Sequence, residues 1–320
     1  METKKKIMRQ FLSYMGALLI LLGMVSCEEE YLPIPPEAID DIVVEGYIEA
    51  GEDARPVFVF LTRALPFFSE LDINGFSDLY VKGAMVSVTD DNSNEVFLTE
   101  ICWSDLSDEL KAIIAQQIGL PTGVVPFDLC AYVDLNGEVD AREGGTYTLN
   151  IDVDGNSLSA ITTVPEHVPL DSLWFEPPRG EPNDSMAELW CKIIDPAGVS
   201  NYYRYLTATD GGPLIAGFAT VTDDAFFDGK SFDFPLTKSE DPQEDIEPAN
   251  FGLFKRGTSA RIKWCNIDEQ HFYFWNTLET SRSRQGPFSS YVRIASNIEG
   301  GLGIWGGYSV SYYDLVVPPK

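Results

Sequence analysis

The fold is decided by one stretch of the chain, YTLNIDVDGNSLSAITT, which occupies residues 147–163. Apolar and polar residues alternate on both sides of Asp154-Gly155-Asn156, a group of residue types that form tight turns. Because side chains alternate between the two faces of a strand, each arm buries one face and exposes the other. The stretch therefore predicts a β-hairpin that belongs to an antiparallel sandwich.

The same strand pattern recurs along most of the chain. A second hairpin is predicted by the β-rich runs 84–89 and 95–99, which flank a polar turn at residues 90–94. Further β-branched and aromatic runs lie at residues 42–48, 57–62, 173–175, 187–194, 202–207, 260–264 and 308–317. The sequence therefore predicts an all-β, mainly antiparallel protein.

A proline-bearing segment, Val164-Pro165-Glu166-His167-Val168-Pro169, marks the predicted domain boundary. Its two prolines favour an extended linker over a continuing strand or helix. We therefore expect two β-sandwich-like domains, one at residues 41–166 and one at residues 167–320.

Each predicted domain carries one short helical insertion. The first lies near residues 105–119 and begins at Ser107, and its apolar residues at 110, 113, 114 and 118 share one face. The second lies near residues 267–281, where a capping box that starts at Asn266 is expected to open the helix.

The start of the chain has the features of an export signal. A basic segment at residues 4–9 precedes an apolar run at residues 11–25, and the small residue Ser26 comes directly before Cys27. The apolar run is shorter than the roughly 20 residues that a membrane-spanning helix needs. Residues 1–26 are therefore predicted to be a lipoprotein signal peptide, with Cys27 as the lipidated N-terminus, and the alternative is a retained signal anchor.

Residues 27–40 are predicted to be an acidic, proline-rich tether. Glu28, Glu29 and Glu30 follow the cysteine directly. An acidic cluster at this place resembles the surface-export signal of Bacteroidota lipoproteins, and the alternative is a solvated spacer without such a role. We expect a protein that is anchored by lipid to the outer membrane and faces outward.

The charge of the chain narrows the choice of partners. The formal net charge is −28 at pH 7. Nucleic acid and anionic lipid head groups both require basic patches, so this charge argues against them as partners. The hydrophobic content of 44% is sufficient for packed cores and argues against disorder.

Four cysteines follow Cys27, and an exported chain meets an oxidising compartment in which such cysteines form disulfides. We prefer the pairs Cys102–Cys130 and Cys191–Cys265, because each pair lies within one predicted domain. The alternative is that two or all four remain buried free thiols. Their spacing fits no zinc site, which would require paired cysteines two to four residues apart.

Three parts of the chain carry a family resemblance. They are residues 43–48 with 81–88, residues 163–165 with 168–172, and residues 296–306. In this order they resemble the Bacteroidota lipoprotein family called domain of unknown function 4249 (DUF4249), and residues 297–303 are the most specific motif. The resemblance implies a two-part, β-rich surface lipoprotein, often encoded beside a TonB-dependent outer-membrane transporter, with no established catalytic residues. The insertion between Cys102 and Cys130 departs from it.

No motif in the chain indicates catalysis, a cofactor or a metal. The run Gly301–Gly306 satisfies G-x-G-x-x-G, but a predicted strand follows it where a nucleotide site needs a helix. We interpret it as a tight turn where backbones approach closely. Acidic turns at residues 72–75, 134–140 and 223–229 do not match the EF-hand pattern, so we predict no metal there.

The leading functional prediction is a non-enzymatic accessory of a TonB-dependent transporter that captures or gates a ligand. The alternatives are an adhesive or envelope-structural surface lipoprotein, and a hydrolase that uses paired carboxylates. The partner-binding candidates are Asn297, Trp305 and Tyr308. Neighbouring glycines would let a partner approach, and a tryptophan offers a rigid anchor.

Overall fold

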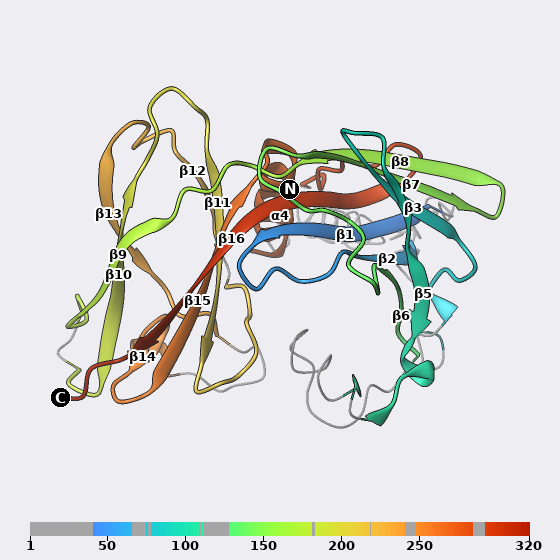
Figure 1. Cartoon of the computed structure of the whole chain (residues 1–320). Helices are drawn as coiled ribbons and strands as arrows, with labels where there is room; N and C mark the ends of the chain where they lie inside the picture. Colours follow the sequence, from blue (N-terminus) through green and yellow to red (C-terminus); the bar gives the residue numbers. More distant parts are fainter. Residues whose placement is uncertain are drawn as a thin grey trace, which may run out of the picture. The chain divides into compact units, whose positions relative to one another are not determined.

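A computed structural model describes residues 41–65, 75, 78–108, 110–111, 128–180, 183–217, 219–240, 247–283 and 292–320 (Figure 1). The predicted signal peptide and tether, with Cys27 and Glu28 to Glu30, lie outside these residues. So does most of the predicted insertion near residues 105–119.

The described chain is an all-β protein, as the sequence predicts, with strands β1 to β16 in three sheets and one longer helix, α4. The strands are Ile42–Gly51 (β1), Phe58–Arg63 (β2), Met85–Asp90 (β3), Glu95–Phe97 (β4), Thr99–Cys102 (β5), Cys130–Val133 (β6), Thr146–Val153 (β7), Asn156–Thr163 (β8), Leu170–Glu176 (β9), Met186–Ile194 (β10), Tyr202–Thr209 (β11), Val221–Asp223 (β12), Ser231–Leu236 (β13), Phe254–Lys255 (β14), Ser259–Ile267 (β15) and Leu302–Val316 (β16). The helix α4 is Glu269–Ser283, and 3-10 turns lie at Trp103–Asp105 and Pro248–Asn250.

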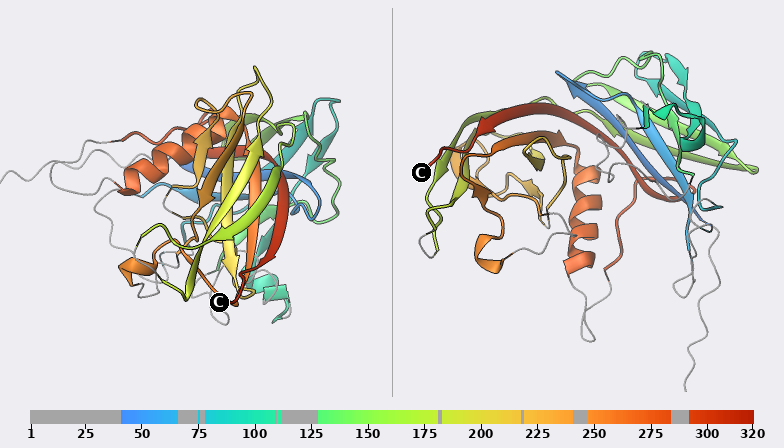
Figure 2. Two further views of the ribbon diagram at one scale, coloured as in Figure 1. Left: turned by 90° about the vertical axis from the view of Figure 1, so that its left-hand side faces the viewer. Right: turned by 90° about the horizontal axis from the view of Figure 1, so that it is seen from below.

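The largest sheet has eight strands in the order β12-β11-β15-β16-β1-β2-β6-β5. Its centre is β16, which pairs with β1 in parallel over residues 302–310 and with β15 in antiparallel over residues 308–316. Figure 2 shows this long strand, in red, bending past α4. The sheet thus contains strands from both sides of the predicted boundary, and the division into two domains near residue 166 stays a prediction.

Two smaller sheets pack against one face of the eight-stranded sheet and form two hydrophobic cores. The first core joins β1, β2 and β16 to the sheet β4-β3-β7-β8, and Trp305 donates from Nε1 to the carbonyl oxygen of Tyr147 at 3.1 Å. The second joins β11 and β15 to the sheet of β9, β10, β13 and β14, around Trp264 and Tyr203. The predicted sandwich-like architecture is confirmed.

Both predicted hairpins form. In the β7–β8 hairpin, Asp154 has φ +51° and Gly155 has φ +80°. Positive φ at both central residues is the two-residue turn that matches the twist of a hairpin, and Asp-Gly is a preferred sequence for it. Strands β3 and β4 form the second hairpin around the polar turn.

The helix predicted near residues 267–281 is α4, but its N-terminal cap differs from the prediction. The side chain of Asp268 caps it, because Oδ1 accepts a hydrogen bond from the backbone N of His271 at 2.7 Å. Asn266 instead lies in β15, where its Oδ1 accepts from the backbone N of Val168 at 3.1 Å. At the other predicted helix, Ser107 Oγ accepts from the backbone N of Leu110 at 3.3 Å, as expected of a helix start.

Candidate functional site

The second face of the eight-stranded sheet carries the candidate site. Successive side chains alternate across the sheet, so Trp264 points into the second core while its neighbour Cys265 joins a third apolar cluster on the other face. That cluster includes Tyr47, Tyr308 and Phe272 of α4. Three adjoining hollows lie along this face of the sheet.

Helix α4 can approach this face closely because β16 has a glycine beneath it. A Cβ atom at Gly306 would lie 2.7 Å from Nδ1 of His271, far inside van der Waals contact. His271 is 1% exposed. Burial, and next the charge of Arg204, lower the pKa of its imidazole to about 3, so the ring is neutral at physiological pH.

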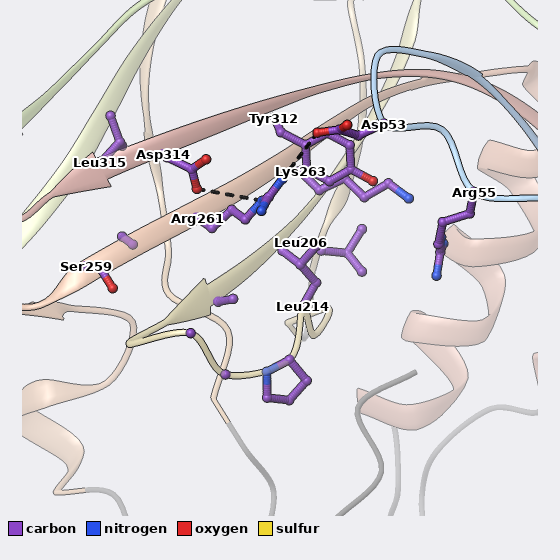
Figure 3. A pocket seen from close by; sticks show the side chains of 15 residues that line it. Asp53, Arg55, Leu206, Leu214, Ser259, Arg261, Lys263, Tyr312, Asp314 and Leu315 are labelled. Carbon is purple, nitrogen blue, oxygen red and sulfur yellow. Dashed lines mark ion pairs between the residues drawn. The ribbon is translucent and has the colours of Figure 1, made fainter. Parts of the chain in front are cut away.

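The first hollow, of about 570 Å³, lies over β11, β15 and β16 (Figure 3). Arg261 lies there between two carboxylates, at 3.8 Å from Asp53 and 3.7 Å from Asp314. Lys263 and Arg55 line the same hollow beyond it.

The second hollow, of about 360 Å³, lies between α4 and the centre of the sheet. It shares Arg55, Leu206, Leu214 and Lys263 with the first hollow. Its other lining residues are Glu45, Tyr47, Phe58, Phe60, Tyr80, Leu129, Arg204, Cys265, Ile267, His271, Trp275 and Tyr308. Rings and cations therefore surround one cavity of a size typical of small-molecule sites.

The third hollow, of about 280 Å³, is apolar and lies toward β5 and β6. It shares Arg55, Phe58, Phe60 and Leu129 with the second. Trp103, together with Leu106 and Leu110 from the start of the predicted insertion, forms part of its wall.

A buried charge cluster lies behind the first two hollows. Oε1 of Glu49 accepts from Lys263 Nζ at 2.8 Å and from Arg55 Nε at 2.6 Å, and it also accepts from the hydroxyl of Tyr308. Burial alone would raise the pKa of the Glu49 carboxyl, but the charges of Lys263 and Arg55 outweigh burial and hold that pKa below its usual value. Two cations share one carboxylate, so the cluster keeps an excess positive charge.

Arg204 is a further cation of the second hollow. Its guanidinium lies 3.5 Å from the centroid of the Trp275 ring. Among the described residues, no carboxylate lies within ion-pair distance of Arg204, and no acceptor reaches Arg204 Nε or Trp275 Nε1. The guanidinium of Arg204 therefore has no ion-pair partner, and these two N–H donors have no acceptor, among the described residues.

Of the three predicted partner-binding residues, Trp305 and Tyr308 are buried and Asn297 is partly exposed. Trp305 is 0% exposed, so the prediction of Trp305 as a surface anchor is wrong. Tyr308 is 5% exposed and lines the second hollow. Asn297 holds the backbone of the same strand: its Nδ2 donates to the carbonyl oxygen of Trp305 at 2.8 Å and its Oδ1 accepts from the Trp305 N at 2.9 Å. At the motif of residues 297–303, Asn297 therefore stabilises the packing of the chain.

Gly303 and Gly306 lie in β16, whereas Gly300 and Gly301 come just before it, with Gly300 in a turn; the predicted close approach of backbones is confirmed. Gly303 has φ +113°, and a Cβ atom there would lie 1.9 Å from the carbonyl oxygen of Val44. Only glycine permits both this conformation and the parallel pairing with β1.

Of the two predicted disulfides, one forms and one does not. Cys102 and Cys130 form a disulfide, and they lie opposite each other on β5 and β6. Cys191 and Cys265 are buried free thiols, so the second preferred pair does not form. The reason is the alternation of β15: Cys191 lies in the second core, whereas Cys265 faces the third cluster across the sheet.

One acidic turn takes part in a cluster of three carboxylates. Asp224 and Asp228 of the turn at residues 223–229 lie with Asp195 so that one oxygen of each is within 4.8 Å of the others. The turn at residues 134–140 is held differently, because both oxygens of Asp134 accept backbone N–H groups, from Glu138 and Val139. Since acidic groups commonly cluster without an ion, we assign no metal.

Sequence reasoning missed Glu49, Arg55, Arg204 and Lys263. A weak signal was present, because Glu49 and Lys263 are charged residues with apolar neighbours on both sides within a strand. The pattern alone does not reveal that the two strands meet beside β16.

The comparisons with known proteins give a family and no function. A family model, Domain of unknown function (DUF4249), matches residues 28–314. No curated protein and no solved structure shows significant similarity to the chain. Within the described residues, none of the helices combines the length and the apolar character that crossing a membrane requires. Since the match covers most of the chain and agrees with the resemblance of residues 43–48, 163–172 and 296–306, the chain belongs to the DUF4249 family.

Proposed function

We propose that this chain is a lipid-anchored protein of the outer-membrane surface that captures a ligand for a TonB-dependent transporter. The observation that carries the proposal is the second hollow, in which Arg204 and Trp275 offer a cation and N–H donors without partners among the described residues. Concave sites with a few convergent polar groups among apolar walls are typical of ligand binding.

The proposed location is supported by the sequence before residue 31. The apolar run ending at Ser26, Cys27 and the three glutamates that follow together have the features of a lipoprotein signal and a surface-export signal. The role beside a transporter rests on what the resemblance of residues 43–48, 163–172 and 296–306 implies, a protein often encoded beside a TonB-dependent transporter. No nucleophile or metal motif in the sequence favours catalysis instead.

Localisation is tested with two variants in the native cell. Cys27→Ser is expected to abolish incorporation of labelled palmitate and to leave the protein soluble in the periplasm. Replacement of Glu28, Glu29 and Glu30 by glutamine is expected to keep lipidation and to remove cleavage by protease added to intact cells. If added protease cleaves neither the parent nor the variants, surface display is wrong.

The partner is tested by purifying the lipid-anchored parent chain from its own outer membrane in mild detergent. Co-purification of a β-barrel transporter supports the proposal. The same extract from cells that carry the Cys27→Ser variant is the control, because a complex assembled at the membrane should be absent there. Repeated absence of a transporter, together with binding of the parent chain to cells or matrix, would instead support an adhesive role.

A further inference from the structure

We propose that the hollow beside Arg204 and Trp275 binds a small aromatic carboxylate. This inference rests on the proposed function and names the chemical class of the captured ligand. Three properties of the hollow support it: among the residues that the structure describes, its cation Arg204 has no ion-pair partner and two of its N–H donors have no acceptor, and its walls include aromatic rings.

The cation requires an anionic ligand. Arg204 projects from β11 into the hollow, on the same face as its pairing partner Cys265. The nearby carboxylate of Glu279 is already engaged, since it accepts from the backbone N and Oγ1 of Thr220 at 3.1 and 2.7 Å. Glu45, which also lines the hollow, accepts from the hydroxyl of Tyr47 at 3.1 Å. The buried Glu49 is shared by Lys263 and Arg55. An added carboxylate would pair with the planar guanidinium of Arg204 and reduce the excess positive charge.

The N–H donors require a ligand that supplies acceptors. Nε of Arg204 and Nε1 of Trp275 are both buried and have no acceptor among the described residues. A buried donor without an acceptor is unfavourable, so a group that brings two oxygen acceptors to this end of the hollow gains more than an apolar group would. A carboxylate carries two such oxygens.

The walls favour a flat, apolar ligand body. The rings of Tyr47 and Phe58 lie edge to face with centroids 5.7 Å apart, and Phe58 and Phe60 do the same at 5.6 Å. Such edges and faces pack well against another aromatic ring. At about 360 Å³ the hollow suits a ligand of one or two fused rings.

Calorimetric titration of the full lipidated chain in detergent tests this assignment with two probes of equal shape, 2-naphthoate and the neutral 2-naphthalenemethanol. We expect 2-naphthoate to bind at least tenfold more tightly than the alcohol. Arg204→Gln should weaken 2-naphthoate at least tenfold while leaving the affinity of the alcohol unchanged, which also shows that the hollow is intact. Arg204→Lys should give an intermediate loss, because it keeps the charge without the planar fork.

Arg261→Gln is the matched control, since Arg261 lines the neighbouring hollow between Asp53 and Asp314 and should leave 2-naphthoate binding unchanged. Equal affinity for the two probes, no saturable binding of 2-naphthoate, or unchanged binding by Arg204→Gln would overturn the assignment. If a transporter co-purifies with a chain that does not bind 2-naphthoate, only the ligand class fails. If 2-naphthoate binds but no transporter co-purifies, the ligand class stands and the transporter role fails.

Discussion

Nζ of Lys263 lies 2.8 Å from Oε1 of Glu49, and the side chains are 2% and 1% exposed. The pair links β15 to β1 across the intervening β16, since Lys263 is paired with Tyr312 and Glu49 with Tyr308. Nζ of Lys263 also lies 4.9 Å from the centroid of the Tyr308 ring. Three strands at the centre of the largest sheet are therefore joined by one buried ion pair.

Glu49→Gln is expected to destabilise the protein strongly, because it leaves the buried Lys263, and the partly exposed Arg55, without their counter-ion. Breaking one partner of a buried pair typically costs about 3–5 kcal/mol of the free energy of unfolding. Urea unfolding at pH 7 measures this change. The double variant Glu49→Gln with Lys263→Met should recover part of the loss, and a loss under about 1 kcal/mol for the single variant would show that the pair contributes little.

The same carboxylate predicts an acid limb of the stability profile. The pKa of Glu49 is held below its usual value, so its contribution is present above the unfolded-state pKa and is lost as pH falls through the lower folded-state pKa. The parent protein should lose free energy of unfolding below about pH 4.3, the usual glutamate pKa. Glu49→Gln should show a shallower fall over that range than the parent.

Trp305→Ala is expected to cost about 3–5 kcal/mol of stability, as for other core tryptophans, because its side chain is fully buried and donates to Tyr147. Thermal or urea unfolding measures the loss. Trp174→Ala is the control, since Trp174 is only partly buried and should cost less. A Trp305→Ala variant as stable as the parent would contradict the placement of this ring in the core.

Gly303→Ala should destabilise the protein by more than about 2 kcal/mol, beyond the ~1 kcal/mol typical of point substitutions. The added Cβ would lie 1.9 Å from the carbonyl oxygen of Val44, at a φ of +113°. Gly180→Ala is the matched control, because nothing lies within 4 Å of its Cβ position. Similar unfolding midpoints for the two variants would exclude the close approach of β16 to β1.

Intact-mass analysis is expected to find one disulfide. Reduction and alkylation should add two alkyl groups for Cys102 and Cys130, and two more for Cys191 and Cys265 only after unfolding. Burial raises the pKa of the Cys265 thiol to about 11 and that of Cys191 as well, so both thiols should resist alkylation in the native protein. Two disulfides in the native protein would restore the pairing of Cys191 with Cys265.

Asp224→Asn should raise the thermal midpoint at pH 7 in the presence of a chelator. Burial, together with the charges of Asp195 and Asp228, raises the pKa of the Asp224 carboxyl. A raised carboxyl pKa means that stability present at low pH is lost as pH rises through the folded-state value, and the neutral amide avoids that loss. Asp228→Asn, at a more exposed position, removes one of the two charges that act on Asp224 and should raise the midpoint less than Asp224→Asn does. If added calcium stabilises the parent and Asp224→Asn abolishes this effect, the cluster holds a cation.

The sequence by itself determined most of the longer strands, the two hairpins and the helix α4, but not the strands β5, β6, β12, β13 and β14. Alternation with a period of two is a local property, and the Asp154-Gly155 turn fixes the register of its own hairpin without help from the rest of the chain. Cys102 and Cys130 were paired because both lie in one predicted domain, but the same argument failed for Cys191 and Cys265. The structure supplies the reason the first pair forms: strands β5 and β6 are neighbours. The family too could be recognised from short motifs.

Only the tertiary structure decided which strands meet and which face of each strand lines the site. Glu49 and Lys263 are 214 residues apart, and they meet because β16 pairs with β1 on one side and with β15 on the other. A period-two pattern separates the two faces of a strand but contains no information about strand order or helix placement. It therefore could not predict that Arg204 and Trp275 lie next to each other. The same limit explains why Trp305 was misplaced. The sequence around an aromatic residue in a strand looks the same whether its ring packs against a second sheet or faces a partner protein. Here the sheet that contains Tyr147 covers the ring.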